Sequence, residues 1–273
     1  MRRSLRIALA FLAALFLIPA TASADDGRDH DIDVISYNIH HGRGVDGVLD
    51  LERIARLIED SGADVVALQE VDRHFGDRSD WVDQPAWFAD RLRMHVSYGA
   101  NLDLEPLTPG APRRQYGTAL LSRFPIVESS NTYLPKYPGQ EQRGLLQATL
   151  AVHGQSVRVA NTHLTHNNNA ERQEQADAVR QLLSGSRRPT VLAGDLNARP
   201  DVPEIKTLTA VLRDGWVGAG AGPGYTYPVA APASRIDYLL HSGNVITRSI
   251  EVPHSPASDH LPVVARMRVP AGA

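Results

Sequence analysis

Two stretches decide the fold: DVISYNIHHG at residues 33–42 and ADVVALQEVD at residues 63–72. The first is rich in β-branched and aromatic residues over positions 33–39, which predicts a strand. Apolar residues then recur at helical spacing over residues 51–58, before Ser61 and Gly62. The short apolar run DVVALQ at 64–69 is typical of a buried strand. Together these stretches predict a β-α-β unit.

A second unit of the same layout follows later in the chain. Residues 157–164 alternate in hydrophobicity, which predicts a strand that ends in NTHL. Residues 170–183 have the pattern of a helix with one apolar face, and residues 190–194 form an apolar strand that ends in GDLN. Further strand-like runs occupy residues 117–122, 126–134, 145–152, 236–240, 245–252 and 261–268. Residues 103–115 and 218–234, rich in Pro, Gly and Ala, are expected to be rim loops. Many strands with few helices favour an α/β scaffold of two packed sheets with helices outside.

The N-terminus has the pattern of a secretory signal peptide. Arg2, Arg3 and Arg6 precede an apolar run over residues 7–19, and Ala22-Ser23-Ala24 supplies a small-residue cleavage pattern. The alternative is a membrane anchor, but the run is shorter than the roughly 20 residues that span a bilayer. We predict cleavage near Ala24 and a protein secreted to the extracellular space, periplasm or cell wall. No integral membrane segment is expected after that point, and residues 25–273 are expected to form one domain and a monomer.

Composition narrows the chemistry. The sequence has no cysteine, which excludes disulfides, thiol nucleophiles and thiolate metal sites. The net charge of −3 becomes −6 once the three signal-peptide arginines are removed, because residues 1–24 contain no acid. Proteins that bind many nucleic-acid phosphates usually carry a basic face, so the charge argues against a nuclease.

Polar residues stand where the apolar strands end, which is where α/β scaffolds carry their sites. Asn38 closes the first strand and Glu70 ends VVALQE. Each has an ordinary alternative, a turn-forming Asn and a strand-terminating acid. Oxygen ligands of this kind are what Mg²⁺ prefers in proteins.

The second unit ends in His163, within NTHL, and in Asp195 and Asn197, within AGDLN. Side chains two positions apart on a strand share a face, so Asn161 lies on the face of His163 and Asn197 on that of Asp195. A structural histidine and a Gly-Asp turn are the alternatives. A carboxylate beside a carboxamide could order water and donate to a phosphoryl oxygen.

The last candidates are Asp237, in SRIDYLL, and Asp259-His260, in SDHLPV, which is expected to open the final strand. Asp237 could be an ordinary edge acid. With His260 it supplies a carboxylate–imidazole pair, in which the carboxylate raises the basicity of the ring that deprotonates water.

Seven blocks in order, SYNIHHG, ALQEVD, YGTALLSRFPI, NTHL, GDLN, RIDYLL and SDHLPV, resemble those of the endonuclease/exonuclease/phosphatase superfamily. That group includes pancreatic-type deoxyribonuclease, apurinic endonucleases, neutral sphingomyelinases and inositol polyphosphate 5-phosphatases. The resemblance covers residues 31–269. It implies a four-layer α/β sandwich, two packed mixed β-sheets flanked by helices, that hydrolyses phosphate esters with Mg²⁺ or Mn²⁺.

The resemblance also implies roles, position by position. Asn38, Glu70 and Asp259 would hold the metal. His260, oriented by Asp237, would activate water for attack on phosphorus. Asp195 and Asn197 would position that water and the phosphoryl group, and His163 would donate to a phosphate oxygen or assist the leaving group. Arg143 occupies the place of a phosphate-contacting residue, with an ordinary surface Arg as the alternative.

Several assignments stay open. His40, His41 and His166 lie in loops beside the expected site and could contact substrate, and Glu105 could support His163. The substrate could be a phospholipid headgroup, a small phosphoester or a nucleic acid, and the first two are favoured. The nuclease remains an alternative within the same chemistry. A secreted binding protein without activity is an alternative of another class, disfavoured because every matched position is filled.

Overall fold

The computed structural model describes residues 28–271; the predicted signal peptide, residues 1–24, lies outside the described residues. Within this part the strands form two six-stranded sheets. The first has the order β11-β12-β1-β2-β4-β3. Its strands are β1 (His30–Asn38), β2 (Val65–Arg73), β3 (His95–Leu104), β4 (Arg114–Ser122), β11 (Ile246–Glu251) and β12 (Val263–Val269). The second has the order β5-β6-β7-β8-β10-β9. Its strands are β5 (Ile126–Tyr133), β6 (Gly144–Val152), β7 (Gln155–His163), β8 (Thr190–Asp195), β9 (Arg213–Asp214) and β10 (Asp237–His241).

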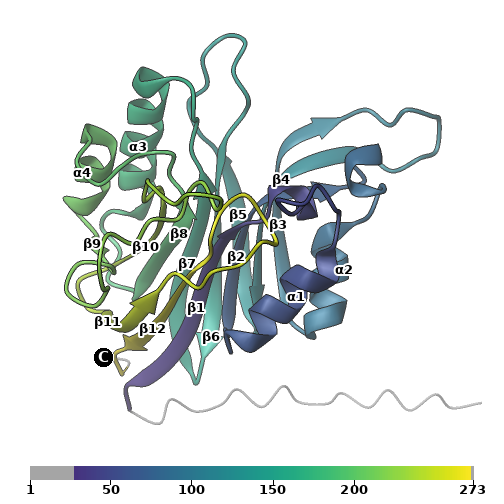
Figure 1. The fold of residues 1–273 in the computed structure, drawn as a ribbon. Coiled ribbons are helices and arrows are strands. Elements are labelled where there is room, and N and C mark those ends of the chain that lie inside the picture. The colour runs from purple at the N-terminus through teal and green to yellow at the C-terminus, as the bar shows by residue number, and fades with distance from the viewer. Residues whose placement is uncertain (1–27, 272–273) are drawn as a thin grey trace, which may run out of the picture.

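Helices cover the outer face of each sheet, and the predicted four-layer α/β sandwich is confirmed (Figure 1). The helices are α1 (Leu51–Asp60) and α2 (Gln84–Leu92) on the first sheet, and α3 (Asn169–Leu183) and α4 (Pro203–Thr209) on the second. None of these described helices is long and apolar enough to cross a membrane.

Both predicted β-α-β units are present. In each sheet one neighbouring pair is parallel, β1 with β2 and β7 with β8, and the other pairs are antiparallel. The parallel strands are joined by α1 and by α3, since a parallel pair needs a crossover. The carboxyl ends of β1, β7 and β8 therefore carry the SYN, NTH and GD residues, whereas QE lies inside β2, which ends at Arg73.

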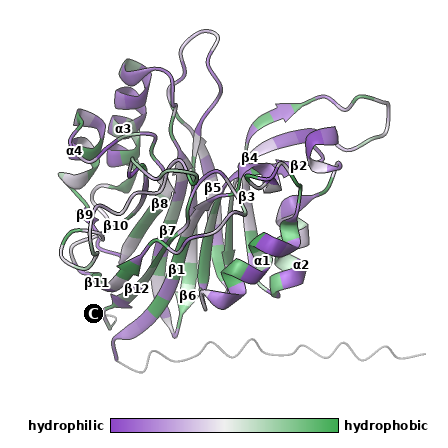
Figure 2. Cartoon of the chain, in the orientation of Figure 1, coloured by the Kyte–Doolittle hydropathy of each residue, from purple (hydrophilic) through white to green (hydrophobic). Residues whose placement is uncertain are grey.

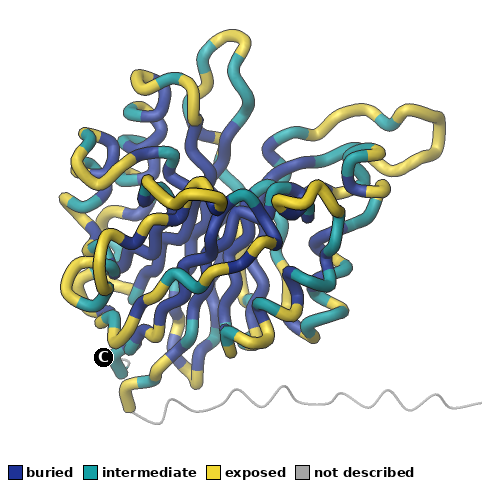
Figure 3. The backbone as a smooth tube through the Cα atoms, viewed as in Figure 1, coloured by how far each residue is buried: buried dark blue, intermediate teal, exposed yellow. Residues whose placement is uncertain are grey.

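Alternation along β1 shows why the layers form. Ile32 and Val34 enter the core between the sheets, whereas Ile35 and Tyr37 pack under α1 and α2. A strand directs successive side chains to opposite faces, so a strand buried on both faces is apolar throughout. The central strands are hydrophobic in Figure 2 and buried in Figure 3, while the connecting loops are exposed. A third apolar cluster lies beneath α3 and α4.

The structure differs from the sequence predictions at several points, and helices α2 and α4 and strand β9 were not among the predicted elements. Strand β3 was not predicted, and the expected loop 103–115 includes the last residues of β3 and the first of β4. Glu70 does not end its strand: β2 continues to Arg73 through an irregularity, where its pairing with β4 shifts between Leu68 and Val71. Asp259 and His260 precede the final strand rather than open it, because β12 begins at Val263.

Candidate active site

Three site residues occupy one row across the second sheet. The parallel pairing of β7 with β8 sets His163 opposite Asp195, and the antiparallel pairing of β8 with β10 sets Asp237 opposite Asp195. Along their strands, all three alternate in step with residues such as Val159, whose side chains face the first sheet. They are nearly fully buried. Strand register alone therefore brings together residues far apart in the sequence.

The first sheet completes the site from the opposite side. Asn38, the last residue of β1, donates from Nδ2 to Glu70 Oε1 at 3.0 Å and to Asp195 Oδ2 at 3.1 Å. Its Oδ1 accepts from the backbone N–H of His40 at 3.0 Å. Asn38 is fully buried. It therefore ties the carboxylates of the two sheets together.

Below the site a second polar contact joins the sheets. Gln69 Nε2 donates to Asn161 Oδ1 at 2.8 Å, and Asn161 Nδ2 donates to the carbonyls of Leu68 and Ala119, both at 2.9 Å. Asn161 does share the face of His163, as predicted, but it is a structural residue between the sheets. Buried hydrogen bonds between the sheets favour one register of the two layers.

Asp237 and His260 form the predicted dyad. His260 Nδ1 lies 3.0 Å from Asp237 Oδ2, which assigns the proton to Nδ1 and leaves Nε2 to face Asp195 Oδ2 at 3.7 Å. Burial lowers the pKa of His260, but the charges of Asp237 and Asp195 outweigh burial and raise it to about 10. The ring of Tyr227, a residue that the sequence did not single out, lies 4.7 Å from the His260 ring.

Asp195 is the centre of the cluster. Burial and the charge of Asp237 raise the pKa of Asp195 to about 7, against the opposing effect of His260. Its Oδ1 accepts from the backbone N–H of Asn197 at 2.9 Å. The Asn197 side chain donates to the carbonyl of Leu164 at 2.9 Å, so it holds the end of β7 in place.

His163 is oriented by Arg143, not by Glu105. Arg143 Nη1 lies 3.0 Å from His163 Nδ1, and because a guanidinium only donates, Nδ1 accepts and Nε2 carries the hydrogen. That Nε2 lies 3.4 Å from Asp195 Oδ2. Burial and the charge of Arg143 hold the pKa of His163 well below its usual range, so the ring is neutral. Glu105 instead pairs with Arg113 at 2.6 Å and its side chain is 82% exposed, which excludes the support that the sequence suggested.

Arg143 itself is buried and also pairs with Glu141 at 2.9 Å. No motif pointed to Glu141. The only signal in the sequence was its position two residues before Arg143, in EQR. The structure thus places Arg143 in the site as a support for His163.

The proposed metal ligands are suitable for a divalent cation. Glu70 and Asp259 are partly exposed carboxylates, and Asn38 Oδ1, which accepts the His40 N–H, has a second lone pair for a cation. Asp259 lies near these residues, beside His40. Nδ1 of His40 lies 3.8 Å from Asp259 Oδ1, and ligand atoms of His40 and Glu70 lie within 4.8 Å of each other. Hard oxygen donors at one edge are a set that Mg²⁺ or Mn²⁺ accepts.

This constellation can be compared with known proteins. A model described as the Endonuclease/Exonuclease/phosphatase family matches residues 35–260, which span the whole site. The chain belongs to this family. The resemblance inferred from the seven blocks is thereby confirmed.

Relatives of this family member support the fold. An endonuclease/exonuclease/phosphatase structure from Beutenbergia cavernae is 32% identical, with a TM-score of 0.75 over 88% of this chain and 72% of that one. A mannosyl-6-phosphatase from Bacteroides thetaiotaomicron is 19% identical, with a TM-score of 0.68 over 86% and 99%. Protein cwh43 of Schizosaccharomyces pombe is 30% identical over 162 residues. The aligned region covers 58% of this chain but only 15% of that protein.

Proposed function

We propose that this family member is a secreted, divalent-metal-dependent phosphoesterase whose substrate is a phospholipid headgroup or another small phosphoester. The observation that carries the reaction class is the buried row His163, Asp195 and Asp237, with His260 Nδ1 held 3.0 Å from Asp237. This arrangement supplies a base and a neutral donor at one point between the sheets.

Each side chain has a task in the hydrolysis. The neutral form of His260 accepts a proton at Nε2 from water, which Asp195 Oδ2, 3.7 Å from that nitrogen, helps to orient. The resulting hydroxide attacks phosphorus as the bond to the leaving alkoxide breaks. Asp237 stabilises the imidazolium that forms. The neutral His163 directs its Nε2–H toward the same point, where it donates to a phosphoryl oxygen.

A divalent cation bound by Glu70, Asp259 and Asn38 would neutralise charge on the phosphoryl oxygens and the leaving alkoxide, and would lower the proton affinity of nearby imidazoles. The side chains of Asn38 and Glu70 are linked at 3.0 Å, so these two ligands are held together before any cation binds.

An apolar hollow favours an amphiphilic substrate. It has a volume of about 390 Å³ and lies between the loop after β2 and the arm that connects β3 to β4. Leu107 on this arm is 65% exposed and Trp81 38% exposed. Exposed apolar residues around a hollow are typical of a lipid or ligand contact, and the net charge of −6 after Ala24 opposes strong binding to duplex DNA.

The test is to measure which phosphate esters the purified protein hydrolyses in the presence of Mg²⁺ or Mn²⁺. The substrates are bis-p-nitrophenyl phosphate, sphingomyelin and phosphatidylinositol vesicles, inositol phosphates, and plasmid and single-stranded DNA. We expect turnover of the small or lipid esters that His260→Ala and Glu70→Ala both abolish. His241→Ala is a matched control, because this buried histidine lies at the opposite end of β10 from Asp237.

Preferred turnover of DNA would replace the substrate assignment with the nuclease while leaving the mechanism in place. A folded, metal-supplied protein that turns over none of these esters would instead favour a binding protein.

A further inference from the structure

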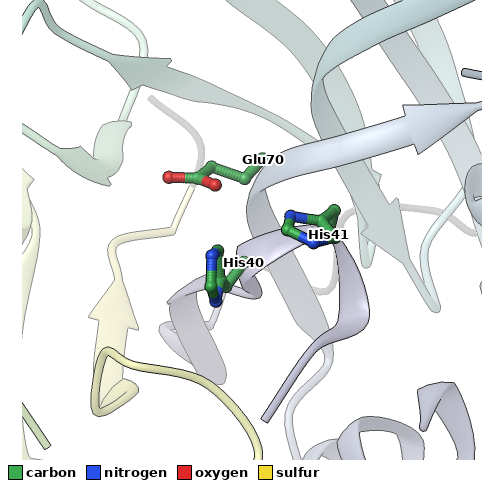
Figure 4. Close-up of side chains that lie close together, drawn as sticks. All are labelled: His40, His41 and Glu70. Carbon is green, nitrogen blue, oxygen red and sulfur yellow. The ribbon is translucent and has the colours of Figure 1, made fainter. Parts of the chain in front are cut away.

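Two consecutive histidines follow β1 and take no part in the dyad. His40 and His41 lie in the short helix η1 (His40–Gly42). Each offers a ring nitrogen, and with a carboxylate oxygen of Glu70 these atoms all lie within 4.8 Å of one another. Figure 4 shows the two imidazoles on the same side of Glu70. Small side-chain rotations would bring all three within reach of one ion, since Zn–N and Zn–O bonds are about 2.0 to 2.2 Å long.

His41 is the stronger indication of a ligand. It is 8% exposed, and within the described residues its Nδ1 has no hydrogen-bond partner. A buried polar atom without a partner loses the hydrogen bond that water would supply, and a bound ion would restore a contact to it. Among the described residues, Nδ1 of His40 also has no hydrogen-bond partner, and it lies 3.8 Å from Asp259 Oδ1.

The loop is held in this conformation from both sides. The backbone N–H of His40 donates to Asn38 Oδ1 at 3.0 Å, and the buried Gln84 donates from Nε2 to the carbonyl of His41 at 2.8 Å. Both histidines have left-handed backbone, with φ of 45° and 46°. Non-glycine residues adopt this region rarely, so the contacts impose the conformation that turns both rings toward Glu70.

We propose that His40, His41 and Glu70 form a binding site for a borderline divalent transition metal of the Zn²⁺ or Co²⁺ class. Two imidazoles and one glutamate are a donor set that Zn²⁺ accepts with a further position open. Imidazole nitrogen favours Zn²⁺ over Mg²⁺, which takes oxygen ligands and retains its waters. The inference goes beyond the proposed hydrolysis, which needs only the oxygen donors, although the two sites share Glu70.

The test is direct metal binding to the purified, metal-free protein. Calorimetry would give Zn²⁺ and Mg²⁺ affinities, and the visible absorption of bound Co²⁺ would report nitrogen ligation. His40→Asn and His41→Asn remove each imidazole while keeping a residue that tolerates left-handed backbone. His74→Asn is the matched control, because His74 also has left-handed backbone, with φ of 50°, and lies outside the cluster.

We expect each of the two variants to weaken Zn²⁺ binding by at least about tenfold and to change the Co²⁺ spectrum, with Mg²⁺ affinity within about threefold of the parent. The control should match the parent. Zn²⁺ affinities equal to that of His74→Asn would overturn the proposal, as would a parallel loss of Zn²⁺ and Mg²⁺ binding. If His41→Asn does not fold, His40→Asn decides, since the His40 side chain is 36% exposed.

Mg²⁺-supported hydrolysis by the parent protein is measured separately. Nitrogen-dependent Zn²⁺ binding without any hydrolysis would refute the proposed function alone. Hydrolysis with Zn²⁺ binding that ignores both histidines would refute the transition-metal site alone.

Discussion

Replacing Asp237 by Asn tests the central dyad. Asp237 Oδ2 lies 3.0 Å from His260 Nδ1, and the two residues are 1% and 5% exposed. Asn has the same shape as Asp but no charge. A change in the pH dependence of Asp237→Asn therefore reports the electrostatic effect of this carboxylate on the ring.

The magnitude follows from the distance. Two unit charges 3.0 Å apart attract by about 5 kcal/mol at an effective dielectric constant of about 20, equivalent to roughly 4 pH units as an upper limit. Asp195 and Asp259 remain and also raise the pKa of His260. We therefore expect a displacement of about 1 to 3 pH units.

Asp237 favours the protonated ring, so its loss lowers the pKa of His260, and Nε2 stays free of a proton to lower pH. The acid limb of kcat/KM should move toward lower pH. The weaker base should also reduce kcat by about 10²- to 10⁴-fold, the usual contribution of general-base catalysis.

The assay is the pH–rate profile with the best substrate of the panel, for Asp237→Asn beside Asp214→Asn. Asp214 is a buried carboxylate on the neighbouring strand β9, bonded to Arg235 at 2.8 and 3.0 Å, so this control loses a buried ion pair outside the dyad. Its acid limb should not move. A stationary acid limb in Asp237→Asn, or a loss of kcat smaller than about tenfold, would refute the assignment of His260 as general base.

Three further outcomes are expected. Asn161→Leu removes one of the acceptors of Gln69 Nε2, which keeps Ala67 O and Ser36 Oγ, and removes the side-chain donor to two carbonyls, so urea denaturation should show a loss of about 1 to 3 kcal/mol; a loss within experimental error would contradict the inter-sheet contact. The folded chain keeps His163 neutral whereas the unfolded chain protonates it below about pH 6.5, so stability falls as pH decreases, and His163→Gln should reduce this dependence by up to about 1.4 kcal/mol per pH unit. Leu107→Ser should lower turnover of vesicle phospholipid several-fold and leave bis-p-nitrophenyl phosphate unaffected; an equal effect on both would argue against the apolar hollow as a lipid contact.

Much of the fold could be predicted because strands and helices have local periodicities. The alternation of Ile32, Val34, Ile35 and Tyr37 directs side chains into two different cores, and this pattern is readable without coordinates. Strand β3 was missed because its residues, HVSYGANLDL, are mostly polar and only partly buried. At the edge of a sheet the apolar pattern that marks a strand is weak.

The candidate site was predicted as a list of residues, not as a set of contacts. Motif order identified Asn38, His163, Asp195, Asp237 and His260, and the structure brings them together. The sequence offered Glu105 as support for His163, but Arg143 takes that place. The start of β6 pairs with the end of β7, so Arg143, which directly precedes β6, lies beside His163, whereas Glu105 lies in the segment that connects β3 to β4.

The sequence by itself therefore determined the two β-α-β units, the alternation that builds the layers, and the residue types of a phosphoester site. Only the tertiary structure decided which nitrogen of His163 carries the hydrogen, that Asn38 joins Glu70 to Asp195, and that His40 and His41 face Glu70. The physical reason is range. Periodicity and capping act between residues a few positions apart, whereas these contacts join residues on different strands and sheets, where register and packing set the distances.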